Sequence, residues 1–116
     1  MKKIYHLGTC STNKRILKEL NLKDVELQDI KTKPISKNQI EEMAEMAGSY
    51  EALFSRKAMK YRSLGLSEMK LSEGDYKKYI IEEYTFLKRP VAIIDNDIFI
   101  GNSKQIIEKL KIKLNM

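Results

Sequence analysis

The sequence predicts an α/β fold with a mixed four-stranded sheet, in the element order βαβ, a helical insertion, and ββα. Near both ends of the chain, short apolar runs and apolar–polar alternation are typical of strands. In the middle of the chain, apolar residues recur every three or four positions, which indicates amphipathic helices. With 116 residues, 42% of them hydrophobic and 33% charged, the composition fits one globular domain.

The opening part is predicted to form a strand, a helix and a second strand. Residues 2–7 contain a short apolar run that Gly8 ends. Ser11 or Thr12 is expected to cap a helix that has a regular apolar face. Residues 25–30 alternate between apolar and polar side chains, as a half-buried strand does. A strand–helix–strand unit favours two parallel strands joined by a right-handed crossover.

The middle of the chain, residues 36–84, is predicted to be a helical insertion. Ser36 and Gln39 fit a capping box at the start of one helix. Ser49 is expected to open a second helical stretch, and Ser72 to cap a third helix that extends to the end of the insertion. We find no internal repeat in this region.

The last part returns to a period of two. Residues 91–94 and 98–101 are predicted to form a hairpin around a turn at 95–97. Asn102 or Ser103 then caps a final helix. This order of elements is that of a thioredoxin-like, or glutaredoxin-like, fold with a helical insertion.

The net charge of +6 is carried by the predicted thioredoxin-like part, residues 1–35 and 85–116. These two segments carry +4 and +3, whereas the insertion, residues 36–84, carries −1. We expect residues 1–116 to form a single domain with this division. A basic surface attracts small anions or nucleic acid and stabilises a thiolate. No run combines aromatic and basic residues in an RNA-binding motif, so direct nucleic-acid binding ranks last.

The cysteine count excludes several classes of protein. One cysteine forbids an intrachain disulfide, and one cysteine beside one histidine cannot supply the four ligands of a structural zinc site. We therefore expect no metal. No apolar stretch approaches the roughly 18 residues of a membrane-spanning helix, so we expect a cytoplasmic protein without a membrane partner.

Cys10 is the main candidate for chemistry. It follows the first predicted strand and precedes the first helix, where free backbone N–H groups and the helix dipole stabilise a thiolate. His6, Lys14 and Arg15 lie close to it in the sequence and add positive charge. The alternative is that a lone cysteine is a small buried apolar residue. The position at a strand–helix junction favours the chemical interpretation.

Three collinear segments carry a resemblance to a known family. Residues 5–14 (YHLGTCSTNK), 61–66 (YRSLGL) and 88–93 (KRPVAI) resemble the ArsC/Spx/YffB family, which comprises glutaredoxin-linked arsenate reductases and their relatives. Together they span most of the chain. The resemblance implies a thioredoxin-like fold with a helical insertion, in agreement with the order of elements above.

The resemblance also implies roles for individual residues. Cys10 matches the nucleophilic or redox cysteine, and His6 matches a histidine often found four residues before it. Arg89 matches the arginine of an Arg-Pro motif, and Pro90 matches a proline that is cis in thioredoxin-like folds. We expect Arg89 to bind an anion beside Cys10 through its planar guanidinium. The remaining candidates for stabilising a thiolate or oxyanion near Cys10 are Asn13, Lys14 and Arg15.

The chain also departs from the pattern of this family. Arsenate reductases of the family hold the oxyanion with further arginines, but Ser55 and Gly101 stand at two such positions. Arg56 lies next to the first position and substitutes for it only with a shift. Spx-type redox switches carry Cys-x-x-Cys, and here Asn13 replaces the second cysteine, which excludes an internal disulfide switch.

Two function classes follow. The first is a thiol-dependent oxidoreductase whose Cys10 attacks a small oxyanion or a disulfide, with glutathione or glutaredoxin as the external reductant and no bound cofactor. The alternative is a Spx-like regulatory protein that binds RNA polymerase without a Cys-x-x-Cys switch. We rank the enzyme first.

Overall fold

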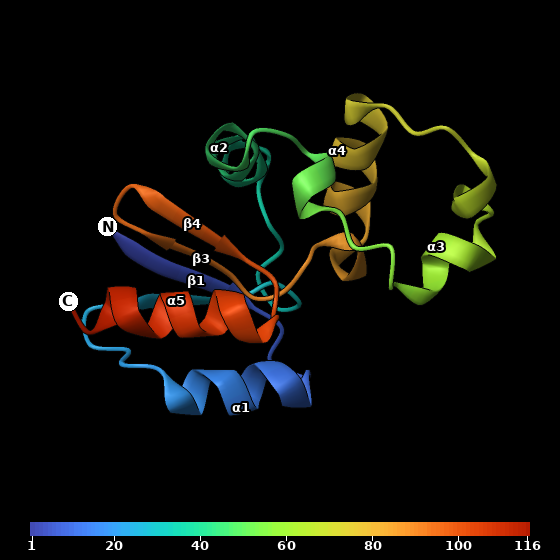
Figure 1. Cartoon of the computed structure of the whole chain (residues 1–116). Helices are drawn as coiled ribbons and strands as arrows, with labels where there is room; N and C mark the ends of the chain where they lie inside the picture. The colour runs from blue at the N-terminus through green and yellow to red at the C-terminus, as the bar shows by residue number, and fades with distance from the viewer. The chain divides into compact units, whose positions relative to one another are not determined.

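The computed structural model describes residues 1–116, and their contacts divide the chain into two compact units. The sheet unit comprises residues 1–33 and 89–116, and the helical unit comprises residues 34–88 (Figure 1). The helical unit contains the predicted insertion, but it begins at residue 34 rather than 36 and ends at residue 88 rather than 84.

The sheet unit contains the mixed four-stranded sheet that the sequence predicts, in the order β2-β1-β3-β4. Strand β1 (Lys2–His6) lies at the centre, parallel to β2 (Glu26–Asp29). On its other side β1 pairs antiparallel with β3 (Val91–Ile94), which forms a hairpin with the edge strand β4 (Asp97–Ile100). The predicted α/β class is confirmed.

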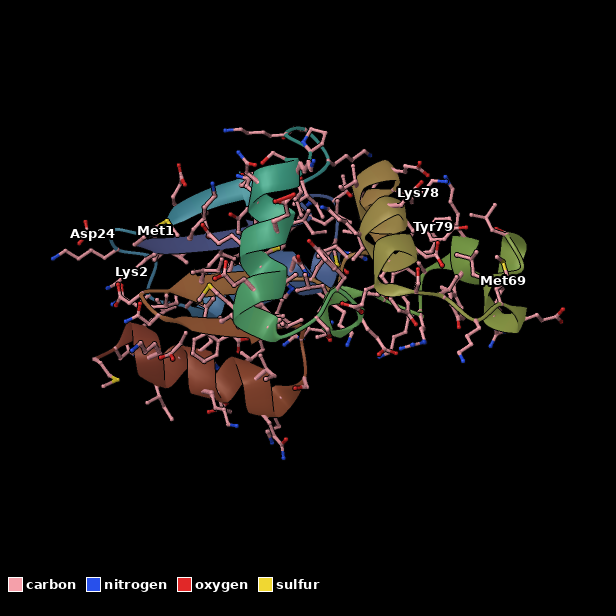
Figure 2. The ribbon with its side chains drawn as sticks, turned by 90° about the horizontal axis from the view of Figure 1, so that it is seen from above. Met1, Lys2, Asp24, Met69, Lys78 and Tyr79 are labelled. Atoms are coloured by element: carbon pink, nitrogen blue, oxygen red, sulfur yellow. The ribbon has the colours of Figure 1, made fainter.

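Two helices cover one face of this sheet. Helix α1 (Ser11–Glu19) and helix α5 (Lys104–Leu114) lie side by side, and both begin at the end of the sheet where β1 finishes (Figure 1). Figure 2 shows Met1, Lys2 and Asp24 at the opposite end of the sheet. Burial of apolar side chains between sheet and helices is the main stabilising contribution here. The buried cluster is Ile4, Ile16, Leu20, Ala92, Ile94, Ile107, Leu110 and Leu114.

In the helical unit, α2 (Lys37–Ala47) and α4 (Glu73–Glu82) each begin at a capping box. At the first box the Ser36 hydroxyl accepts the backbone amide of Gln39 at 3.1 Å, and the second box begins at Ser72. Side-chain oxygens thereby satisfy amides that the helix itself leaves unpaired. Both predicted caps are confirmed. None of the helices combines the length and the apolar character that crossing a membrane requires.

The second helical stretch predicted at Ser49 is much shorter than expected, although the Ser49 Oγ atom does accept the Ala52 amide at 3.1 Å at its start. Only a 3₁₀ turn (Glu51–Leu53) forms there, and the short helix α3 (Met59–Ser63) follows later. The reason is long-range pairing, because Phe54 forms an isolated antiparallel bridge with Leu87 and its backbone is therefore extended. A sequence period cannot reveal a bridge between residues so far apart.

The aromatic side chain of Phe54 is the centre of the helical unit. It is fully buried, and its ring lies 4.9 Å from that of Tyr76 and 5.9 Å from that of Tyr61. It stacks on Phe86 at 5.1 Å, and Tyr79 of α4 meets Phe86 edge-on. Such ring pairs add to the free energy gained from burial alone.

Candidate functional site

Cys10 is the N-cap residue of α1 and is half-buried. Its backbone is extended, its amide donates to the Leu7 carbonyl oxygen at 3.0 Å, and its own carbonyl accepts the Lys14 amide at 3.0 Å. The prediction that Ser11 or Thr12 caps this helix is therefore wrong, because the tight turn after Leu7 starts the helix one residue earlier. The Cys10 side chain makes no capping hydrogen bond.

Asn13 fixes the first part of the loop that leads to Cys10. Its side chain is only 2% exposed, and its Oδ1 accepts the Leu7 amide at 2.9 Å. A buried backbone amide left unpaired costs about 1–3 kcal/mol, so this hydrogen bond is a structural requirement of the loop. From the sequence we predicted that Asn13 stabilises a thiolate or an oxyanion. In the structure the Asn13 side chain binds the loop backbone.

Asp29, at the end of β2, fixes the next residue of the same loop. Its Oδ1 accepts the Gly8 amide at 3.1 Å and the Lys31 amide at 3.1 Å. The Gly8 hydrogen bond above all, with the Lys31 amide and the nearby His6, holds the pKa of the Asp29 carboxyl below its ordinary value. A Cβ atom at position 8 would lie 2.2 Å from Asp29 Oδ2, so a larger residue there would have to displace this carboxylate.

Sequence reasoning missed Asp29, although a usable signal was present. Parallel strands joined by a right-handed crossover end at the same edge of a sheet. The last polar residue of the second predicted strand therefore falls beside the loop that follows the first strand. The observed register agrees, because Asp29 lies opposite His6, the last residue of β1.

His6 brings a histidine ring to the same edge of the sheet. Its Nδ1 atom is buried and has no hydrogen-bond partner. Its carbonyl oxygen accepts the Ile30 amide at 2.9 Å, which holds the end of β1 against the end of β2. The imidazole is thus a polar group near the Cys10 loop whose Nδ1 the fold itself leaves unused.

Arg89 and Pro90 immediately precede β3 and lie at the same edge of the sheet. The peptide bond between them is cis, the isomer that the family resemblance implies. The pairing of β1 with β3 reaches Tyr5 and Val91, so Arg89 and Pro90 lie next to the point where β1 ends. Pro90 is buried and its carbonyl oxygen accepts the Gly101 amide at 2.9 Å, while Arg89 carries a buried Nε atom.

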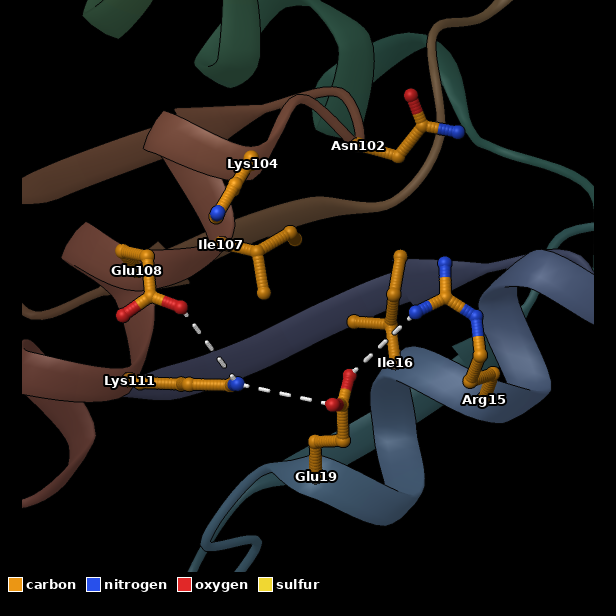
Figure 3. Close-up of a pocket in the computed structure, with 8 residues that line it drawn as sticks. All are labelled: Arg15, Ile16, Glu19, Asn102, Lys104, Ile107, Glu108 and Lys111. Atoms are coloured by element: carbon orange, nitrogen blue, oxygen red, sulfur yellow. Dashed lines mark ion pairs between the residues drawn. The ribbon is translucent and has the colours of Figure 1, made fainter.

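Lys14 and Arg15 are both exposed on α1. The Arg15 Nη1 atom lies 3.8 Å from Glu19 Oε2, one turn further along the helix (Figure 3). Both cations therefore contribute positive charge to the helix that begins at Cys10, and only Arg15 shares its charge with a carboxylate of that helix.

Arg56 belongs to the helical unit and has partners there. Its Nη2 atom lies 2.7 Å from Glu51 Oε2 and 3.0 Å from the Tyr76 hydroxyl oxygen. The Arg56 guanidinium holds the pKa of the Glu51 carboxyl below its ordinary value. The sheet unit thus collects every predicted site residue except Arg56. No three His, Cys, Asp or Glu side chains in the chain converge in a way that could hold a metal ion.

Comparison with known proteins relates this arrangement to one family. The sequence model of the ArsC family matches residues 5–110. Among solved structures, a YffB protein superposes with a TM-score of 0.78 at 16% identity over 96% of this chain and 99% of that one. An arsenate reductase from Vibrio cholerae superposes with a TM-score of 0.75 at 17% identity, over 97% of this chain and 96% of that one. A possible arsenate reductase from Streptococcus mutans superposes with a TM-score of 0.73 at 26% identity, over 95% of this chain and 97% of that one. No curated protein matches. The predicted thioredoxin-like fold is confirmed.

Proposed function

The chain belongs to the ArsC family, and from this premise we propose that it is a thiol-dependent oxidoreductase with the Cys10 thiolate as nucleophile. One observation carries the proposal. The sole thiol of the chain stands at the N-terminus of α1, and its side chain is not used as a cap. The loop before it is held by two side chains, Asn13 and Asp29, that bind successive backbone amides.

The proposed reaction with a disulfide needs no bound cofactor. The Cys10 thiolate attacks one sulfur of an external disulfide, a new S–S bond forms, and the other sulfur leaves with the electron pair as a thiolate. A second external thiol, from glutathione or glutaredoxin, then attacks the mixed disulfide and releases Cys10. Because the chain has one cysteine, this resolving sulfur has to come from another molecule.

Among substrates we favour a disulfide over an oxyanion such as arsenate. Only Arg89 occupies a position where the arsenate reductases of the family hold their substrate, since Ser55 and Gly101 replace the other arginines. Arg56, the neighbour of Ser55, already binds Glu51. Beside Cys10, the site therefore supplies fewer charge-assisted hydrogen bonds to an oxyanion than arsenate reduction requires.

The test is formation of a mixed disulfide at Cys10. The purified protein is mixed with glutathione disulfide, and the adduct is followed by intact-mass spectrometry, with Cys10→Ser as the blank. We expect an adduct on the wild type only, and its removal by glutathione with glutaredoxin. Absence of both the adduct and arsenate turnover would overturn the proposal and favour the alternative, a Spx-like partner of RNA polymerase.

A further inference from the structure

Exposed apolar side chains gather in one short segment of the helical unit. Met59, Leu64 and Met69 are 90%, 55% and 54% exposed. They belong to residues 57–70, named here the α3–η2 segment because it contains α3 and the 3₁₀ turn η2 (Leu66–Glu68). Within the helical unit this segment lies at one end, with α4 between it and α2 (Figures 1 and 2). Single exposed apolar residues are common, but several in one short segment indicate a binding surface.

The α3–η2 segment is anchored from the inside. Tyr61 of α3 packs edge-on against the buried ring of Phe54, and Leu66 of η2 is fully buried. The Gly65 amide donates to the Arg62 carbonyl oxygen at 2.9 Å, which closes the turn between α3 and η2. No residue of α3 itself is buried. The outward side chains are thus presented by a backbone that is already fixed, which lowers the entropic cost of binding a partner.

The charges of the helical unit are unevenly divided between this segment and the rest. The segment has four basic residues and one acidic residue, a net charge of +3. The remainder of the unit, residues 34–56 and 71–88, has five basic and eight acidic residues, a net charge of −3. Within the segment, only Lys60 pairs with a carboxylate, that of Glu83. The other three cations are exposed and have no carboxylate partner: Lys57, Arg62 and Lys70.

We propose that the α3–η2 segment is a docking surface for an acidic, amphipathic segment of a partner protein. Apolar side chains of the partner cover Met59, Leu64 and Met69, and its carboxylates face the three unpaired cations. The flexible thioether of methionine adapts its shape to a partner, and the cations favour acidic partners and accelerate the encounter. This binding goes beyond the proposed function, because the Cys10 reaction needs no residue of the segment.

The composition of the surface argues against other occupants. A second copy docked through the same surface would bring together two segments that each carry +3. A lipid surface takes the long apolar face of an amphipathic helix, whereas α3 has five residues. Single-stranded nucleic acid takes cations with exposed aromatic rings, but the exposed apolar side chains here are methionine and leucine. An acidic amphipathic protein segment fits both the charge and the apolar side chains.

The experiment uses two synthetic helical peptides that carry a fluorescein label. Both have leucine at positions i, i+3, i+4 and i+7; the remaining positions are glutamate in one peptide and lysine in the other. Fluorescence anisotropy measures the Kd of each peptide for the full-length protein. The variants are Met59→Ser and Arg62→Gln, three positions apart on α3. Ile112→Ser and Lys109→Gln are the matched controls, because these residues are also exposed and three positions apart, on α5.

We expect the wild type to bind the glutamate peptide and not the lysine peptide. Met59→Ser should weaken binding about five- to thirtyfold, the effect of truncating an apolar side chain that the partner covers. Arg62→Gln should weaken it about two- to fivefold, and high salt should remove this difference, because the cation is exposed. Both α5 variants should bind as the wild type does.

Three results would overturn the proposal. The first is equal affinity for the two peptides, and the second is an equal loss of affinity in the α3 and α5 variants. The third is failure to bind the glutamate peptide, whether or not the protein sediments with vesicles of phosphatidylcholine and phosphatidylglycerol or forms a dimer that Met59→Ser dissociates. Vesicle binding would then identify a lipid surface as the occupant, and such a dimer would identify a second copy.

Discussion

The two units of the chain use polar groups in different ways. All three buried polar residues, Lys3, Asn13 and Gln28, belong to the sheet unit, where Asn13 and Gln28 bind backbone groups of Leu7 and Lys33. The helical unit buries apolar and aromatic side chains and places its ion pairs at the surface, such as that of Lys77 with Glu41. Because a buried polar group is costly unless it is paired, its presence indicates a geometry that has to be maintained.

This comparison indicates where each unit is sensitive. In the sheet unit, side-chain hydrogen bonds hold the amides of Leu7 and Gly8 in the loop before Cys10, so changes of polarity or backbone space should matter most. In the helical unit, stability depends on the volume of packed rings, so changes of side-chain size should matter most.

The largest expected effect concerns the substrate. Arsenate chemistry would need arginines at the positions of Ser55, in the helical unit, and Gly101, in the sheet unit. Each missing charge-assisted hydrogen bond is worth about 1.5–3 kcal/mol of transition-state stabilisation. The absence of two of them lowers the rate of arsenate reduction about 10²–10⁴-fold. We expect weak arsenate turnover, and we expect measurable exchange of Cys10 with glutathione disulfide. Both rates are measured on one preparation, with Cys10→Ser as the blank, and efficient glutaredoxin-dependent arsenate reduction would falsify this prediction.

The next effect tests packing in the helical unit. Phe54→Ala should lower the free energy of unfolding by about 3–5 kcal/mol, because it removes a fully buried ring. Phe99→Ala in the sheet unit is the matched control, since Phe99 is only partly buried against its core. Urea unfolding of both variants should show a clearly smaller loss for Phe99→Ala. Equal losses would mean that the aromatic cluster is not the centre of stability of the helical unit.

The same contrast explains how far the sequence could be interpreted. Strands β1, β3 and β4 were predictable because local apolar residues and turns indicate them. The helices that follow Ser36 and Ser72 were predictable because each begins with a capping pattern of four residues. The 3₁₀ turn before Phe54 was not predictable, because it depends on a bridge to Leu87.

In the site, the type of a residue indicated chemistry better than it indicated geometry. Cys10, His6, Arg89 and Pro90 could be placed at one edge from the order of elements and the family resemblance. The contribution of Asn13 could not, since an asparagine at that position is equally compatible with binding an oxyanion and with accepting a loop amide. Only the observed contact of its Oδ1 with the Leu7 amide distinguishes the two.

Two glycine substitutions, one in each unit, test how much space the backbone has for a larger side chain. Gly8→Ala should destabilise the protein by about 1–3 kcal/mol, because a Cβ would meet Asp29 Oδ2 at 2.2 Å. Gly74→Ala, in the first turn of α4, meets nothing closer than Ser72 Oγ at 3.8 Å and should stabilise by about 0.4–1 kcal/mol.

Urea unfolding measures both glycine effects, and the rate of mixed-disulfide formation at Cys10 separates their consequences. That rate should fall in Gly8→Ala, whose substitution moves the loop before Cys10, and stay unchanged in Gly74→Ala. A stable Gly8→Ala variant with the wild-type rate would show that the contact between Gly8 and Asp29 does not position the thiol.

The smallest effect compares one carboxylate from each unit. Backbone amides lower the pKa of Asp29, mainly through Gly8, and that of Asp75, mainly through Ser72, from an ordinary value of 3.8. A lowered pKa in the folded state means that the stabilising contribution is present above about pH 4 and disappears as the pH falls through the folded-state value. Asp29→Asn and Asp75→Asn should therefore each make stability less dependent on pH in this acid range. Urea unfolding at a series of pH values measures the slope of the free energy of unfolding against pH. Amide hydrogen exchange shows which of the two units responds, since only Asp29→Asn should make protection of the Gly8 amide independent of pH. An acid slope in Asp29→Asn equal to that of the wild type would show that the Asp29 charge contributes nothing to holding the Cys10 loop.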